Sequence, residues 1–205
     1  MKRLAGIITL FLMILIVQSV FAQRGYLGLG LGGNLAIVVG DYGDVAGTGY
    51  GGTGSILYRV SREAGLNAYS GYISHSKKEE SYIDQGTGNE TQFKREYQYK
   101  EIPAMFGANY IFGRRGPQPY LGGHMGFFWF EGIEKFPELI YLDPDTGEPV
   151  ADYKEETNTK TKFAWGLAGG VLLGNFDLSA EYIHVVDARQ FLIRLAFNIP
   201  LKKGS

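Results

Sequence analysis

Three histidines, His75, His124 and His184, are the residues of this chain best suited to metal binding or proton transfer. The nearest two are 49 positions apart (124 − 75), whereas structural zinc sites usually draw their ligands from closely spaced pairs. Cysteine is absent, so no thiolate is available as a ligand. The pattern predicts no metal site, and we assign no catalytic residue.

The stretch Gly28-Leu29-Gly30-Leu31-Gly32-Gly33 matches the dinucleotide-binding pattern G-x-G-x-x-G. That pattern requires a strand before it and a helix after it. Here an apolar leader precedes the glycines and a strand-like alternation follows them. We interpret them as small residues of a β-strand and predict no cofactor.

Asp143-Pro144-Asp145-Thr146-Gly147-Glu148 resembles half of a calcium-binding loop. A complete loop places a third ligand two residues after Asp145 and then a glycine. Gly147 occupies the place of that ligand, and Glu148 the place of the glycine. We interpret the stretch as a turn, and weak cation binding by the acidic surroundings stays open.

The end of the chain predicts a polar cluster. A turn centred on Asp187-Ala188 would place Glu181 opposite Arg194 and Asp177 opposite Asn198, with all four side chains on the face away from Tyr182 and Ile193. We predict a Glu181–Arg194 ion pair inside a barrel, joined by Asn109 or Lys162, that plugs the lumen, because buried charges must be paired. The alternative is unpaired charges in lumen water.

Period-2 alternation predicts eight strands. In the first, Leu29, Leu31 and Ile37 share one face, and Gly30, Asn34 and Ala36 share the other. Large residues outside and small ones inside are typical of a barrel wall. The predicted strands cover residues 26–40, 49–60, 64–75, 96–112, 119–134, 161–173, 176–186 and 189–201.

The connections alternate in length. Three of the four odd-numbered connections are long, at 41–48, 76–95 and 135–160, whereas the even-numbered ones are short turns. Outer-membrane barrels show this asymmetry between their two rims. A soluble lipocalin-like barrel would carry polar residues outside, but here they are Leu, Ile, Phe, Trp and Tyr. We predict an all-β fold, an eight-stranded antiparallel up-and-down transmembrane β-barrel.

Residues 1–22 have the layout of a secretory signal peptide, with Lys2 and Arg3 before an apolar run and Val20-x-Ala22 as the cleavage site. We prefer cleavage to an uncleaved anchor because the apolar run is shorter than the ~20 residues that span a bilayer. The mature domain, 23–205, keeps 18 of 20 basic residues against 21 acidic ones, a net charge of about −3. This balance argues against a nucleic-acid partner.

The chain resembles the small eight-stranded outer-membrane barrels of the OmpA/OmpX type, also described as porin-family outer-membrane β-barrel domains. The resemblance lies in Gly28–Gly33, Glu101–Gly107, Pro119–Gly123 and Ser179–Tyr182. It implies location in the cell outer membrane, a monomer, and outer-membrane lipid and the barrel-assembly machinery as partners. The His-x-Ser pair of the lipid A deacylases and the Asp-His constellation of omptin proteases do not match here.

We therefore expect a non-enzymatic barrel with a structural role, a surface-recognition role, or both. The predicted loops 76–95 and 135–160 would contact an extracellular ligand, because exposed loops on a rigid scaffold often carry recognition residues. A narrow channel or small-ligand carrier is one alternative, and a lipid-modifying enzyme is a second. The candidate contact aromatics are Tyr82, Phe93, Phe136, Tyr141 and Tyr153.

Overall fold

A computed structural model describes residues 25–40, 42–84, 91–113, 116–142, 149–186 and 188–202. The predicted signal peptide and the stretch Asp143–Glu148 lie outside the described residues. The elements are β1 (Leu27–Val39), α2 (Tyr42–Val45), β2 (Gly49–Arg59), β3 (Ala64–His75), β4 (Lys78–Asp84), β5 (Thr91–Ile111), β6 (Gln118–Leu142), β7 (Pro149–Leu173), β8 (Phe176–Val185) and β9 (Ala188–Lys202). Among the described residues, no helix is both long and apolar enough to cross a membrane.

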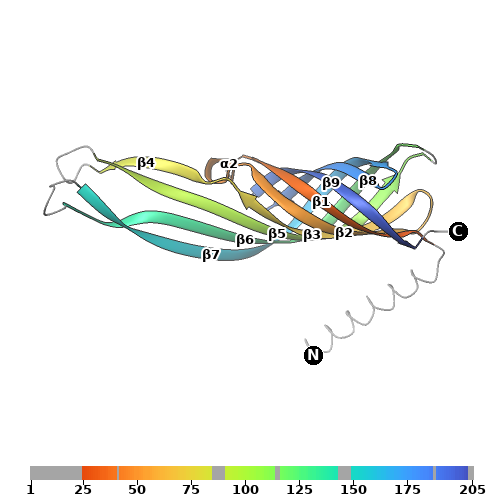
Figure 1. The fold of residues 1–205 in the computed structure, drawn as a ribbon, viewed down its shortest axis with the longest axis horizontal. Coiled ribbons are helices and arrows are strands. Elements are labelled where there is room, and N and C mark those ends of the chain that lie inside the picture. The colour runs from red at the N-terminus through yellow and green to blue at the C-terminus, as the bar shows by residue number, and fades with distance from the viewer. Residues whose placement is uncertain are drawn as a thin grey trace, which may run out of the picture.

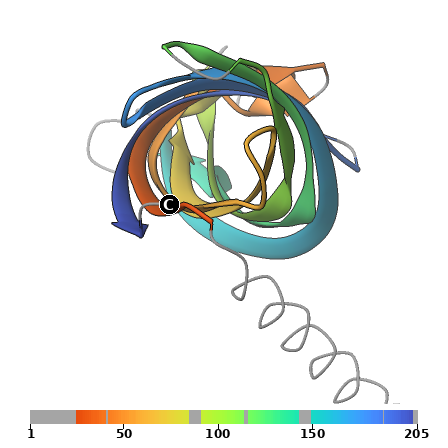
Figure 2. The ribbon, with the colours of Figure 1, turned by 90° about the vertical axis from the view of Figure 1, so that its right-hand side faces the viewer.

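The strands form one closed antiparallel barrel. Strands that are neighbours in the sequence pair with each other around the ring, except for β3 and β4. Instead, β3 pairs with β5, and β1 pairs with β9 to close the ring. Because β4 continues β3 along the same side of β5, the nine strands of the described chain occupy eight positions. Figure 2 shows the ring of strands viewed end-on, along the axis of the barrel. The predicted eight-stranded up-and-down barrel is confirmed.

Side chains alternate between the two faces of the wall as predicted. In β1, Leu29, Leu31 and Ile37 are exposed on the outside, whereas Asn34 and Ala36 are buried inside. A Cβ on Gly30 would lie 2.2 Å from Ser55 Oγ and 2.7 Å from Asn198 Oδ1, so any larger residue there would displace these two side chains. The glycine-rich motif therefore lies within a strand and makes room for lumen side chains from the neighbouring strands.

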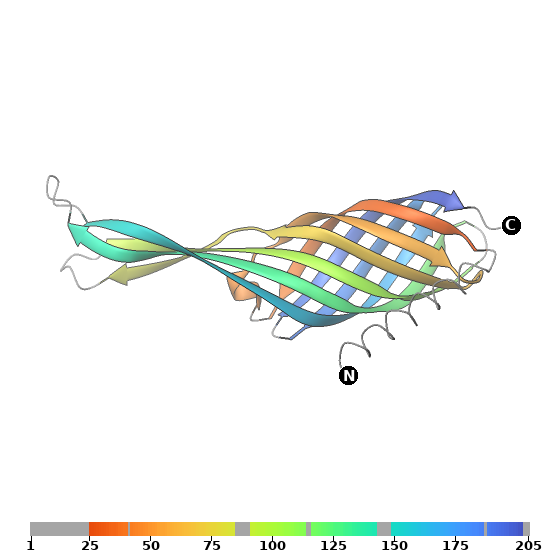
Figure 3. The same ribbon diagram turned by 90° about the horizontal axis from the view of Figure 1, so that it is seen from below.

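The predicted loops 76–95 and 135–160 are wrong in their local structure. Most of their described residues are strand: β4 pairs with the first part of β5, and β6 and β7 stay paired from Gln118–Leu172 out to Leu142–Pro149. Together, residues 78–84, 91–100, 131–142 and 149–161 form a four-stranded sheet, called the arm below, that projects from one end of the barrel (Figures 1 and 3). The third predicted loop, 41–48, contains the short helix α2.

Polar side chains explain why the strands of the arm are not predicted from the sequence. Its outer face carries charged residues and threonines, including Lys100, Glu131 and Thr159, which are unremarkable in a loop. The antiparallel β6–β7 ladder nevertheless continues from the barrel into the arm, with one register shift between Pro137 and Leu139. The length of the strands, rather than their number, departs from the prediction.

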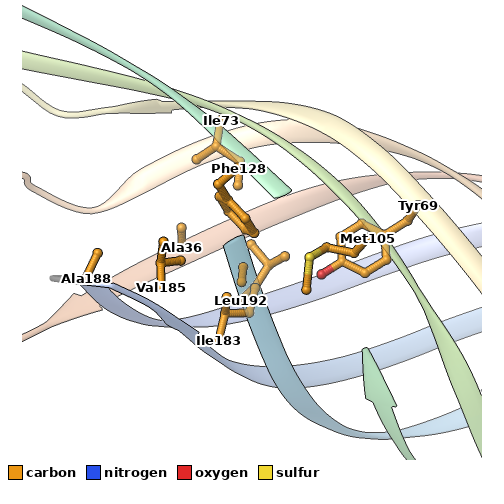
Figure 4. Packing of buried hydrophobic residues seen from close by; sticks show 10 residues of the cluster. Ala36, Tyr69, Ile73, Met105, Phe128, Ile183, Val185, Ala188 and Leu192 are labelled. Carbon is orange, nitrogen blue, oxygen red and sulfur yellow. The ribbon is translucent and has the colours of Figure 1, made fainter. Parts of the chain in front are cut away.

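An apolar layer lies inside the barrel (Figure 4). Phe128, Ile73 and Ile183 in this layer are fully buried. Buried apolar side chains from seven of the eight wall positions meet here, so the wall is packed from within. The cluster consists of Ala36, Tyr69, Ile73, Met105, Phe128, Ala164, Ile183, Val185, Ala188 and Leu192.

Candidate functional site

The five residues of the predicted lumen cluster all lie on the inner face of the barrel. Glu181, Arg194, Asn198 and Asn109 are buried, and Asp177 is half-buried. Each comes from a strand whose neighbouring positions point outward, so the alternation of the wall brings them into the interior.

The predicted pairing of these residues is wrong by two positions. Val185 pairs with Ala188, so the turn between β8 and β9 lies one residue earlier than expected. Glu181 therefore faces Leu192, Arg194 faces Ser179, and Asp177 faces Ala196. Moving the centre of a turn by one residue shifts every partner by two, which changes the pairs and leaves each side chain on its face.

The close partners of Glu181 come from across the lumen. His124 Nδ1 on β6 lies 2.8 Å from Glu181 Oε1, and the Tyr69 hydroxyl on β3 donates to Oε2 at 2.9 Å. The His124 and Glu181 side chains are 0% and 3% exposed. A buried carboxylate is tolerated when such partners satisfy it.

Arg194 lies between a carboxylate and an aromatic ring. Its Nη2 is 3.9 Å from Asp177 Oδ2, and its Cζ is 4.6 Å from the centre of the Tyr69 ring. The Tyr120 hydroxyl donates to Asp177 Oδ1 at 2.9 Å. Asn109 and Asn198 border a cavity of about 10 Å³ beside Arg194. Lys162, the other suggested member, instead donates to the Val186 carbonyl oxygen at 3.1 Å.

A second Glu–His pair lies on the other side of the apolar layer. Glu101 on β5 is 0% exposed, and its Oε1 lies 3.0 Å from His75 Nε2. The Tyr42 hydroxyl donates to the same oxygen at 2.9 Å, and Gln190 Nε2 donates to Oε2 at 3.0 Å. Tyr42 belongs to α2, so this carboxylate also fixes the short helix over the mouth of the barrel.

Both ring nitrogens of His75 have close polar neighbours. Its Nδ1 lies 2.8 Å from the Gly47 carbonyl oxygen, and its Nε2 lies 3.0 Å from Glu101 Oε1. Because Tyr42 and Gln190 also donate to Glu101, the buried carboxyl group has polar neighbours at both of its oxygens.

Sequence reasoning missed Glu101, His75, His124 and Tyr69 as lumen residues. The signal for two of them was available: Glu101 shares its parity with Met105 and Asn109, and His124 shares its parity with Phe128. Their pairing was not available, because cross-lumen contacts depend on how far the strands are staggered around the barrel. The third histidine, His184, points outward, and its ring centre lies 5.3 Å from that of Trp165.

These residues form layers along the barrel. One polar layer contains Arg194, Asp177 and Glu181, the apolar layer follows, and the Glu101 pair lies beyond it towards the arm. Within the described part of the chain, no group of three His, Asp or Glu side chains is arranged to hold a metal ion. Some polar atoms of these layers are buried without a hydrogen-bond partner among the described residues, including Nε and Nη1 of Arg194 and Oδ1 of Asn109.

The inner face of the arm continues the lumen surface and is rich in aromatic rings. Arg95 lies over the rings of Tyr97 and Phe136, at 5.7 and 5.6 Å from their centres, and forms an ion pair with Glu134. Of the predicted contact aromatics, Phe136 lies here. Tyr153 is exposed at 45% on the outer face. The side chains of Tyr82, Phe93 and Tyr141 lie outside the described part of the structure.

A pocket of about 400 Å³ lies where the arm joins the barrel. Rings from α2, β5 and β6 form one wall, and polar side chains of β7 form the other. The lining includes Tyr42, Tyr99, Phe130, Glu156, Asn158 and Lys160.

The outer surface changes character within single strands. The cross-strand row Ala104, Phe127 and Phe163 is followed towards the arm by Ile102, Trp129 and Thr161, and then by Lys100, Glu131 and Thr159. Lys100 Nζ lies 2.8 Å from Glu131 Oε1 in that last row. The apolar exterior therefore ends within two rows, at the base of the arm.

The barrel is similar in fold to small outer-membrane proteins of known structure. Two crystal structures of Ail, the attachment invasion locus protein of Yersinia pestis, match with a TM-score of 0.52 and with 13% and 14% sequence identity. In both, the match covers 86% of this chain and 100% of Ail. One of them contains the heparin analogue sucrose octasulfate.

Neisserial surface protein A also matches, with 14% identity, a TM-score of 0.46 and coverage of 86% of this chain and 97% of that one. No protein-family model and no curated protein matches the sequence. The resemblance to the OmpA/OmpX type of barrel is thus confirmed in the fold.

Proposed function

We propose that this chain is a monomeric, non-enzymatic protein of the cell outer membrane that carries a recognition surface on a rigid arm. Residues 1–22 direct export and are removed, and the barrel-assembly machinery inserts residues 23–205. Lipid surrounds the barrel, and the arm extends into the extracellular medium to contact a ligand there.

The change of the outer surface at the base of the arm carries this proposal. Large apolar side chains cover the outside of the barrel, which in water would be an aggregation-prone surface and in a bilayer is the expected lipid-facing band. Beyond the row Lys100–Glu131–Thr159, the outer face is charged and suits water. The exposed apolar residues include Leu31, Phe106, Leu121, Phe127, Trp129, Phe163, Trp165, Leu167, Phe191, Leu195 and Phe197.

The filled lumen supports a structural role rather than transport. Eight strands leave room only for side chains or one small ligand, and here two polar layers enclose an apolar one. We expect the refolded protein to give no discrete conductance steps in planar bilayers. Stepwise currents that are seen with the protein and are absent from the same bilayers without it would support the narrow-channel alternative instead.

The arm supports a role in recognition. It is a four-stranded extension that adds nothing to closure of the barrel, and its inner face presents rings and charges beside a pocket. Ail, the structural relative described above, is named for attachment and invasion and has been crystallised with a heparin analogue. That likeness supports the general kind of function, and the arm gives it a location in this chain.

An arm-trimmed variant tests the proposal. Residues 76–98 and 132–158 are each replaced by Asn-Gly, which keeps the cross-strand registers of Ser74 with Lys100 and of Glu131 with Thr159 and closes each hairpin with a favoured two-residue loop. A heat-modifiable band on unheated gels verifies folding. Cells that display the full chain should attach to epithelial monolayers more than trimmed-chain cells do. Equal attachment by two folded proteins would contradict the role of the arm.

A further inference from the structure

The pocket at the base of the arm has one aromatic wall that is held in place. The ring centres of Tyr42 and Tyr99 are 5.5 Å apart at 77°, and those of Tyr42 and Phe130 are 6.0 Å apart at 90°. The bond from the Tyr42 hydroxyl to the buried Glu101 fixes the central ring. Edge-to-face contacts of this kind are favourable, so the wall is formed before any ligand arrives.

Gly132 keeps the pocket open beside Tyr99. The two residues are cross-strand partners, and a Cβ on Gly132 would lie 3.0 Å from Tyr99 Cε1. The missing side chain lets the Tyr99 ring lie across the strand. A flat apolar surface results, bounded by backbone rather than by a bulky neighbour.

The opposite wall carries hydrogen-bonding groups in a row. Glu156, Asn158 and Lys160 alternate along β7 and line the same pocket. Glu156 is 3.4 Å from Lys154, whereas Asn158 and Lys160 have no hydrogen bond or ion pair with another described residue. The row therefore offers an acceptor, an amide and a free ammonium to a ligand.

We propose that this pocket binds a saccharide unit. A sugar ring has an apolar C–H face that packs on aromatic rings and an edge of hydroxyl groups that needs donors and acceptors, and the two walls provide these in turn. The volume lies in the range of small-ligand pockets, ~300–1,000 Å³. Its lining mixes two lysines with two glutamates, Lys160, Lys162, Glu134 and Glu156. Each glutamate also has a basic neighbour outside the lining, Arg95 or Lys154. Such a mixture of donors and acceptors suits the hydroxyl groups of a neutral sugar, whereas a polyanion would meet the two glutamates. This inference rests on the proposed recognition role of the arm and names its ligand class.

The test uses the full chain refolded in detergent, with an array of neutral and amino-sugar oligosaccharides of one to four units as probes. Sucrose octasulfate serves as the anionic comparator, and core oligosaccharide released from lipopolysaccharide distinguishes a membrane source from a soluble glycan. Binding to any array member is then measured by calorimetry for the parent chain and three variants. Tyr99→Ala removes the platform, Asn158→Trp fills the pocket from the exposed wall, and Thr159→Ala is the matched control on the opposite face of the same strand.

We expect Tyr99→Ala to weaken binding by about tenfold, as for loss of one aromatic contact, and Asn158→Trp to abolish it, with Thr159→Ala unchanged. Heat-modifiable migration verifies that each variant folds. Absence of saccharide binding, preference for sucrose octasulfate alone, or equal affinity in the pocket variants would overturn the inference. If the arm-trimmed cells lose attachment while the full chain binds no saccharide, this inference fails and the recognition role stands. If trimming leaves attachment intact, the recognition role fails independently.

Discussion

The lumen and the arm both contain glutamates paired with basic side chains, but in opposite surroundings. Glu101 and His75 have fully buried side chains. In the arm, the side chains of Lys94 and Glu79, 2.7 Å apart, are 61% and 48% exposed. The same kind of pair therefore has different energetic consequences in the two places. A buried charge that loses its partner is not compensated by solvent, whereas an exposed charge on the arm is hydrated when its partner is removed.

This difference shows how one sheet serves two purposes. Inside the barrel, a buried polar group that loses its partner costs stability, so the paired groups constrain one another. On the arm, polar groups are free to change, because the backbone ladder and solvent hold the sheet without them. We therefore expect variation to be tolerated on the arm and sequence constraint to be concentrated in the barrel.

The largest effect is expected from Glu181→Ala. The substitution leaves His124 and the Tyr69 hydroxyl without their acceptor in a buried layer, and we expect the free energy of unfolding to fall by about 3–5 kcal/mol. Urea titration in lipid vesicles, followed through the fluorescence of outward-facing Trp129 and Trp165, measures it. Glu181→Gln keeps the shape and is the control. An alanine variant as stable as the glutamine variant would refute the importance of the buried acceptor group.

A smaller loss is expected from Leu192→Ala in the apolar layer. Leu192 is 1% exposed, and its removal opens a cavity between the two polar layers, at a cost of about 2–4 kcal/mol. The same titration measures this change. The outward-facing Leu195→Ala, on the same strand and 56% exposed to the surroundings of the barrel, is the matched control and should lose less. Equal losses would mean that the interior is not packed as described.

Tyr42→Phe probes the junction between the two regions. It removes one of three contacts to Glu101 and keeps the ring in the aromatic wall, so we expect a loss of about 1 kcal/mol. Removing the ring as well, in Tyr42→Ala, should cost more and increase proteolysis of residues 41–48. Identical behaviour of the two variants would indicate that the ring contributes nothing to holding α2.

The smallest effect is expected on the arm. The Lys94 ammonium, hydrogen-bonded to Glu79, lowers the pKa of the Glu79 carboxyl. Because the carboxyl pKa is lower in the folded state, the pair adds stability above the ordinary carboxylate pKa, and this stability is lost as the pH falls through the folded-state pKa. Solvent around the two exposed side chains screens the contribution. Lys94→Met should therefore leave stability unchanged at neutral pH, while Glu79 titrates at a higher pH in NMR spectra. A clear loss of stability would place the arm in the same class as the lumen.

The sequence predicted the wall of the barrel better than what lies at either end of it. Alternation in β1, β5, β7 and β9 assigned Leu29, Phe106, Trp165 and Phe197 to the outside because apolar and small residues differ clearly there. The arm lacked this contrast, since a sheet with lysine, glutamate and threonine on one face looks like a loop. The Glu181–His124 pair depends on how far the strands are staggered around the barrel, and the β8–β9 register depends on the position of the turn to within one residue. Neither quantity can be read from the residue types.

Labelling of single cysteines tests the placement of the membrane boundary most directly, because the chain has no cysteine of its own. Lys100→Cys, Glu131→Cys and Thr159→Cys lie in the first polar row, and Ala104→Cys and Phe163→Cys lie two rows below in the apolar band. On intact cells that display the protein, a membrane-impermeant maleimide should label the three upper positions, and the two lower positions should react only after denaturation. Equal labelling of both rows, or protection of the upper row in intact cells, would contradict the account.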